Sequence, residues 1–113
     1  MAVDKKLEEM LSPVGIPLAY RQFRPYKNKP VPSPPYLIYL FPSERGYGPD
    51  NCNLIIHKRV SVELYTNAKN TQLEKKVEAA ISAYEYEKSE DYIDSENMYM
   101  VTYDFNIYEK IRR

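Results

Sequence analysis

The stretch that decides the fold, residues 58–84, reads KRVSVELYTNAKNTQLEKKVEAAISAY. Along its first part, apolar Val60, Val62 and Leu64 alternate with more polar residues. Successive side chains of a strand point to opposite faces, so a period of two predicts a strand with one buried face. We therefore expect a strand that ends close to Tyr65, before the polar residues 67–70.

The second part of this stretch has a helical period. Thr71 followed by Glu74 matches a capping box and predicts that a helix begins there. One apolar stripe follows at helical spacing, formed by Leu73, Val77, Ala80, Ile81 and Tyr84. A strand that leads through a polar turn into an amphipathic helix predicts an α+β domain, with the helix packed on the sheet.

The composition limits the class of protein. A chain of 113 residues fits a single domain, 1–113. Sixteen acidic and sixteen basic residues balance, which gives no general reason to expect nucleic acid or a membrane as a partner. The apolar run 36–41 is far shorter than the ~20 residues of a spanning helix. A single cysteine, Cys52, cannot form an internal disulfide, which suits a reducing cytosol. Twelve tyrosines favour half-buried faces and interfaces.

The remaining elements complete an α+β fold of order α-β-β-β-α-β-β. We expect a mostly antiparallel sheet of about five strands, with two helices packed on one side. Five prolines make residues 25–35 an extended arm, because proline donates no backbone hydrogen bond. The other predicted elements are a helix over 3–11, strands over 18–23, 36–41 and 54–65, a hairpin loop over 42–53, and a final hairpin of 90–95 with 99–107.

Candidate chemistry is sparse. Cys52 and His57 are the only thiol and imidazole, and their odd spacing on one predicted strand places them on opposite faces. The acidic residues between 85 and 96 do not match the spacing of a calcium loop, and an edge strand protected by charge explains them better. No phosphate-binding loop, dinucleotide motif or nucleophile elbow occurs in the sequence. The sequence therefore indicates no catalytic, cofactor or metal site, and an enzyme is the third-ranked hypothesis.

Residues 20–29 offer a different kind of candidate. They read YRQFRPYKNK and combine four cations with three aromatic rings and no acid. Such a segment can bind single-stranded nucleic acid by charge and stacking, although a strand end followed by a solvated arm explains it more simply. The segment also complements the acidic residues of 85–96, and two unlike complementary patches favour head-to-tail contacts that close into rings.

Five segments resemble those of small tail proteins of long-tailed phages from Gram-positive hosts. They are GIPLAY at 15–20, PPYLIY at 34–39, VELYTN at 62–67, LEKK at 73–76 and YMVTY at 99–103. The PPY strand, the VELYT strand and the closing YMVTY hairpin recur in these proteins in that order, and the resemblance covers nearly the whole chain. The best-known members are tail terminators, also called tail completion proteins. The resemblance implies a structural protein that forms a ring, commonly a hexamer, at the head-proximal end of the tail tube. It implies no catalysis and no cofactor.

The same resemblance implies the location and partners of the protein. It would lie in the virion tail, after assembly in the host cytoplasm, and contact other copies of itself, the tail tube protein and the head connector. DNA would pass through the ring, and no membrane is involved. A different head–tail connector, a minor capsid component and a small nucleic-acid-binding domain remain as alternatives. The candidate assembly contacts are Arg21, Arg24, Lys27, Lys29, Arg45, Tyr47, Glu87, Glu90 and Asp91.

Overall fold

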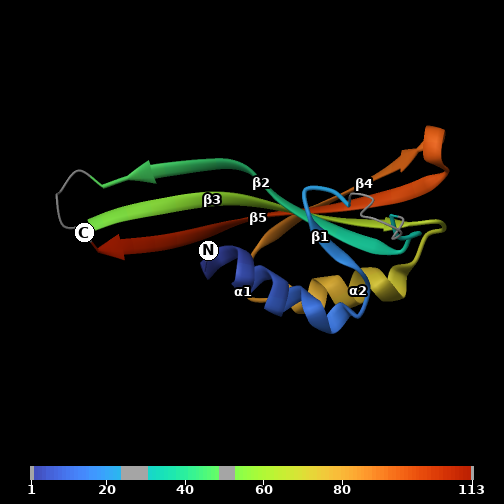
Figure 1. Ribbon diagram of the computed structural model, residues 1–113, viewed down its shortest axis with the longest axis horizontal. Coiled ribbons are helices and arrows are strands. Elements are labelled where there is room, and N and C mark those ends of the chain that lie inside the picture. The colour runs from blue at the N-terminus through green and yellow to red at the C-terminus, as the bar shows by residue number, and fades with distance from the viewer. Residues whose placement is uncertain (1, 24–30, 49–52, 113) are drawn as a thin grey trace.

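Two helices pack on one face of a five-stranded sheet in this computed structural model, which describes residues 2–23, 31–48 and 53–112 (Figure 1). The predicted α+β class and the order α-β-β-β-α-β-β are both confirmed. The elements are α1 (Ala2–Leu11), a 3-10 turn (Ser12–Val14), β1 (Leu18–Tyr20), β2 (Tyr36–Tyr47), β3 (Asn53–Thr66), α2 (Thr71–Ala80), β4 (Tyr86–Ile93), a 3-10 turn (Asp94–Glu96) and β5 (Met98–Arg112).

The strands lie in the order β1-β2-β3-β5-β4, so β1 and β4 form the two edges. Only β1 is parallel to its neighbour β2, while the other three pairs are antiparallel. The mostly antiparallel sheet and the acidic edge strand are therefore as predicted. Strands β2, β3 and β5 are longer than β1 and β4. The edge strands β1 and β4 therefore pair with only part of the length of their neighbours β2 and β5.

The core lies between the helices and one sheet face, which we call the helix-side face. Val60, Val62 and Leu64 of β3 point into it, as their alternation predicted. They pack against Val77 of α2 and Ile81 at its C-terminal end, the two fully buried residues of the predicted apolar stripe. Neighbouring core residues come from α1, β2 and β5: Leu7, Leu11, Leu37, Tyr39, Val101, Tyr103 and Phe105. Burying each aliphatic side chain of this size contributes about 1.5–3 kcal/mol.

The predicted loop over residues 42–53 is wrong for its first half. Strand β2 continues to Tyr47, and residues 49–52 lie outside the described part. Pro42 and Gly46 are residues typical of loops, but both fit this strand. A bulge between Leu40 and Ser43 accommodates Pro42, and Gly46 leaves room for the Leu54 and Ile56 side chains opposite. Proline is tolerated at bulges, and glycine occurs where neighbours approach closely.

Other boundaries differ by a few residues. The first strand ends at Tyr20, not 23, because Arg21 has a φ of 68° and the Gln22 N–H bonds back to the Tyr20 carbonyl. The predicted capping box is also wrong, since the side chain of Asn70 accepts the Leu73 N–H at 3.1 Å and caps α2. Strand β4 begins at Tyr86 instead of 90, and α2 ends at Ala80.

The core assignment predicts the effect of truncating Ile81. Ile81→Ala should lower the free energy of unfolding by about 2–5 kcal/mol, because the side chain is fully buried and leaves a cavity. Ile111→Ala is the matched control, since that isoleucine on β5 is 42% exposed and should cost far less. Urea unfolding of both variants measures the difference, and equal losses would show that α2 does not pack as described.

Candidate interaction surfaces

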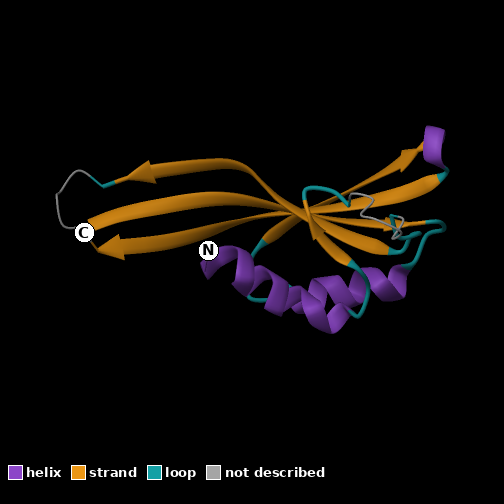
Figure 2. Ribbon diagram, in the orientation of Figure 1, coloured by secondary structure: helices purple, strands orange, loops and turns teal. Residues whose placement is uncertain are grey.

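The long strands continue well beyond the helices and form a three-stranded projection (Figure 2). We call it the sheet extension and define it as residues 43–47 of β2, 53–59 of β3 and 106–112 of β5. Strand β1 pairs only with residues 37–39 of β2, and β4 pairs only with residues 98–105 of β5. Within residues 2–23, 31–48 and 53–112, the extension therefore has two unpaired sheet edges and no helix over it. Exposed sheet of this kind is a surface on which other chains dock.

The helix-side face of the extension carries an apolar strip beside a few charged residues. By register, Ile56 lies opposite Gly46 and Glu109, and Leu54 lies opposite Ile111. Ile107 is nearly buried where the extension meets the core, while Ile111 near the tip is 42% exposed. Lys58 and Glu44 form an ion pair of 3.4 Å in the same row as Ile107, at the core end of this strip. The apolar strip of Leu54, Ile56, Ile107 and Ile111 thus continues the core into solvent.

The opposite face of the sheet, which we call the open face, carries two of the predicted contacts on the extension. Arg45 and Tyr47 both point to it from β2, and the Arg45 guanidinium lies 5.8 Å from the centre of the Tyr47 ring. Both residues belong to the segment that we predicted as a loop, but they lie on strand β2. They lie beside His57 and Ile55 of β3.

Arg21 occupies a separate place, directly after β1 on the body of the sheet. Its backbone N–H bonds to the Tyr39 carbonyl at 2.9 Å, and its side chain lies over the Tyr20 ring. With Tyr20, Gln22 and Leu40 it lines an open hollow of about 770 Å³. The other predicted cations of this segment, Arg24, Lys27 and Lys29, lie outside the described residues, as does the proline-rich part before residue 31.

The predicted acidic contacts lie on the edge strand β4 but on different faces. Glu87 and Asp91 point to the open face, where Glu87 forms an exposed ion pair of 3.4 Å with Arg59. Glu90 points to the helix side and pairs with Lys69. The structure therefore splits the acidic patch into an open-face part and a part that is engaged within the chain.

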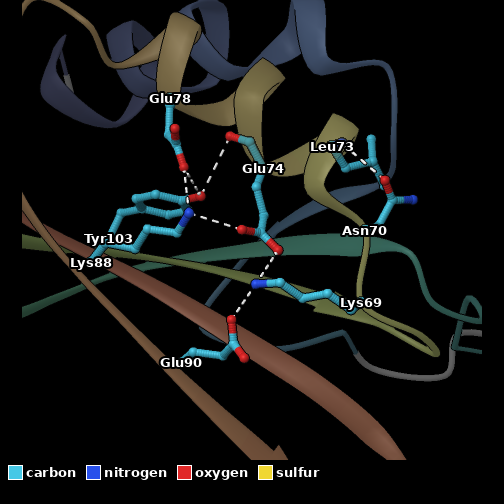
Figure 3. Close-up of polar contacts among 8 residues, drawn as sticks. All are labelled: Lys69, Asn70, Leu73, Glu74, Glu78, Lys88, Glu90 and Tyr103. Carbon is cyan, nitrogen blue, oxygen red and sulfur yellow. Dashed lines mark hydrogen bonds and ion pairs between the residues drawn. The ribbon is translucent and has the colours of Figure 1, made fainter.

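An ion-pair network joins α2 to β4 on the helix side (Figure 3). Glu74 is only 4% exposed and binds Lys69 and Lys88, each at 2.8 Å. Lys88 also binds Glu78 at 2.7 Å, and the Tyr103 hydroxyl donates a hydrogen bond to Glu78 at 2.9 Å. The network links residues that are far apart in sequence, and no local pattern predicts it.

The pKa values in this network follow from burial and pairing. Burial of Glu74 favours its neutral form, but hydrogen bonds from Lys69 and Lys88 outweigh that effect and lower the pKa of its carboxyl. Hydrogen bonds to Glu74 and Glu78 raise the pKa of Lys88. Burial, followed by the contact with Glu78, raises the pKa of the Tyr103 phenol. Each group is held in one protonation state, so the network serves to fix α2 over β4.

Of the cysteine and histidine considered in the sequence, only His57 lies in the described part of the chain, where its ring is engaged by its neighbours. His57 stacks on Tyr108 at 4.7 Å, and its Nε2 lies 2.8 Å from Asn106 Oδ1, while Cys52 lies outside the described residues. Residues 2–23, 31–48 and 53–112 contain no group of three potential metal ligands. Within the same residues, no helix is both long and apolar enough to span a bilayer.

Comparison with known proteins gives a likeness of fold. No protein-family model matches this chain, and no curated protein matches it. Among the solved structures that do match is a chain of the virion of a native gene transfer agent (GTA) particle, with a TM-score of 0.52 and 11% identity. That match covers 100% of this chain and 89% of the other. At this identity the likeness shows a shared fold.

The ion-pair network predicts a pH-dependent contribution to stability. Glu74→Gln should cost about 1–3 kcal/mol at pH 7, because a buried charged hydrogen-bond acceptor is lost. A lowered pKa stabilises the fold above the ordinary glutamate value of 4.5, and this stabilisation is lost as pH falls through the folded-state value. The difference between wild type and variant should therefore shrink at pH 3.

Urea unfolding at both pH values tests this, with Glu90→Gln as the control. Glu90 binds the same Lys69 but is partly exposed, so its loss should cost under about 0.5 kcal/mol. Equal costs for the two substitutions, or a difference that persists at pH 3, would contradict the assigned role of Glu74.

Proposed function

We propose that this protein is a structural component of a phage-like virion, with no enzymatic activity of its own. Three observations support the proposal. The chain shares its fold with a component of a gene transfer agent virion over its full length. Its sequence segments resemble phage tail terminators. Its sheet extension exposes an apolar strip that a partner would cover.

Within the virion, we propose the tail-terminator role. Copies of the chain would form a head-to-tail ring at the head-proximal end of the tail and contact the tail tube protein and the head connector. A heterologous ring requires two unlike surfaces on each subunit. The extension and the acidic edge strand β4 are unlike in chemistry and belong to different parts of the sheet.

The observation that carries the proposal is the uncovered helix-side strip of the extension. A three-stranded sheet gains little stability when water covers both of its faces. The strip is continuous with the core, yet no helix of the described chain lies over it (Figure 1). In a ring, the neighbouring copy would cover the strip and make it part of an interface core, where apolar residues supply most of the affinity.

Light scattering over a series of protein concentrations tests the proposed assembly. Wild type should rise above the 13.3 kDa mass of one chain as concentration increases. Ile111→Asp places a charge on the strip and should keep the protein at the monomer mass. Val31→Asp is the matched control, because Val31 is also 42% exposed but lies outside the sheet extension, and it should assemble like wild type.

Two further results distinguish the roles. In an assembly assay, folded Ile111→Asp should give tails longer than normal if the protein terminates the tube. A connector defect would leave tail length unchanged and would favour the alternative role in head–tail joining. If Ile111→Asp assembles as well as wild type and supports normal virions, the strip is not an assembly surface.

A further inference from the structure

The open face of the sheet extension has an ordered arrangement of cations and rings. Three successive cross-strand rows lie on this face, and each row takes one residue from β2, one from β3 and one from β5. The rows are Ser43–Arg59–Asn106, Arg45–His57–Tyr108 and Tyr47–Ile55–Lys110. Each row contains one arginine or lysine. Rows on one face of a strand are two residues apart, so these cations advance by about 6.7 Å from row to row.

Aromatic groups lie between the cations. The His57 ring stacks on the Tyr108 ring with 4.7 Å between centres and 13° between planes. Tyr108 is 62% exposed, the largest exposure among the bulky hydrophobic residues that are exposed in the described part. On the neighbouring strand β2, the Arg45 guanidinium lies over the ring of Tyr47, two residues further along. The face therefore presents planar groups to solvent that are already oriented by their neighbours.

The charge of this face is of one sign. The two carboxylates of the extension's described side chains, Glu44 and Glu109, belong to the helix-side rows, and Glu44 pairs there with Lys58. Neither Arg45 nor Lys110 forms an ion pair within the described residues. Arg59 pairs with Glu87, but that contact is exposed at both ends and is easily exchanged for another anion.

Acidic residues occupy the other end of the same face. Over the body of the sheet, Glu63, Asp104 and Glu87 point to the open side. The balanced total charge of the chain thus conceals a face with a basic end on the extension and an acidic end on the body. A polyanion would be attracted to the extension and repelled by the body, which confines it to the three basic rows.

We propose that the open face of the sheet extension binds nucleic acid, without sequence preference, through its phosphates and exposed bases. The arginine or lysine of each of the three rows can contact a backbone phosphate. Exposed ring planes among cations are the combination that binds unpaired bases by stacking. An acidic surface of another copy would be matched by the cations alone and would leave the exposed, stacked rings without a role.

This site is distinct from the basic segment 20–29, and it is present on a single copy of the chain, whether or not copies form a ring. Contact with nucleic acid and contact between copies use opposite faces of the extension. The two can therefore fail independently, and each has its own measurement. If copies do assemble through the helix-side strip, the open faces remain available, and several weak sites would act together on one nucleic acid.

Fluorescence anisotropy of the full chain with labelled oligonucleotides tests the site. The probes are a 20-base-pair duplex and a 20-nucleotide oligothymidine, each titrated at several salt concentrations from about 25 to 200 mM. For three phosphate contacts, the logarithm of the association constant should fall with the logarithm of salt by a slope of about −3 for the duplex and about −2 for the single strand. Light scattering on the same samples reports the mass separately.

Variants identify the residues involved. Arg45→Gln combined with Lys110→Gln should weaken binding about tenfold or more at the lowest salt and reduce the duplex slope to about −1. The control combines Lys75→Gln with Lys76→Gln, which removes the same charge from exposed positions on α2 and should bind like wild type. Tyr108→Ser should weaken single-strand binding by about fivefold or more, and duplex binding less.

Three outcomes would overturn the proposal. The first is no saturable binding of either probe at the lowest salt. The second is an equal loss in the control pair, which would indicate a general effect of net charge. The third combines two results: wild type binds no nucleic acid, and the Arg45 and Lys110 variant differs from it in oligomer mass. That outcome would assign the open face to contacts between copies.

Discussion

The mismatch between short helices and long strands shapes this molecule. Each helix has 10 residues, which span about 15 Å, whereas β3 and β5 have 14 and 15 residues and reach about 46–50 Å. Two helices side by side can cover only part of such strands. The covered part becomes the core, and the uncovered part becomes the sheet extension. Past the helices, Ile107, Leu54 and Ile111 still point to the helix side, with Lys58 and Glu109 between them. The uncovered part therefore keeps apolar side chains on the face that the helices cover elsewhere.

The ion-pair network adds polar contacts between α2 and the part of the sheet that the helices cover. Glu74 and Glu78 of α2 bind Lys88 of β4, and the Tyr103 hydroxyl bonds to Glu78 from β5. These contacts hold α2 at the β4 side, away from the extension. Among the described residues, no helix covers either face of the extension, and the two faces differ in chemistry. One carries the apolar strip, and the other combines cations with aromatic rings.

The fold could be predicted from sequence wherever one local pattern dominated. The strand around Val62 was predicted from a period of two, and the helix around Val77 from a helical period. The burial of both apolar faces confirms these predictions. The loop prediction failed because Pro42 and Gly46 are common in turns, whereas here a bulge and two opposing side chains accommodate them in a strand. The capping box failed by one residue, because Asn70 and Thr71 are both good caps. Arg45 and Tyr47 were found by composition, but their grouping with His57, Tyr108 and Lys110 depends on strand register, which sequence alone does not provide.

The central claim is that the apolar strip of the extension becomes buried only when copies of the chain associate. Amide hydrogen exchange of the whole chain, followed across protein concentration, tests it most directly. We expect the amides of residues 60–64 in the covered part of β3 to be protected at every concentration. Those of residues 54–58 and 107–111 should exchange quickly when the protein is dilute and become protected as copies associate. Protection of the extension that is already complete in the most dilute sample, or that does not change while the mass rises, would contradict the claim.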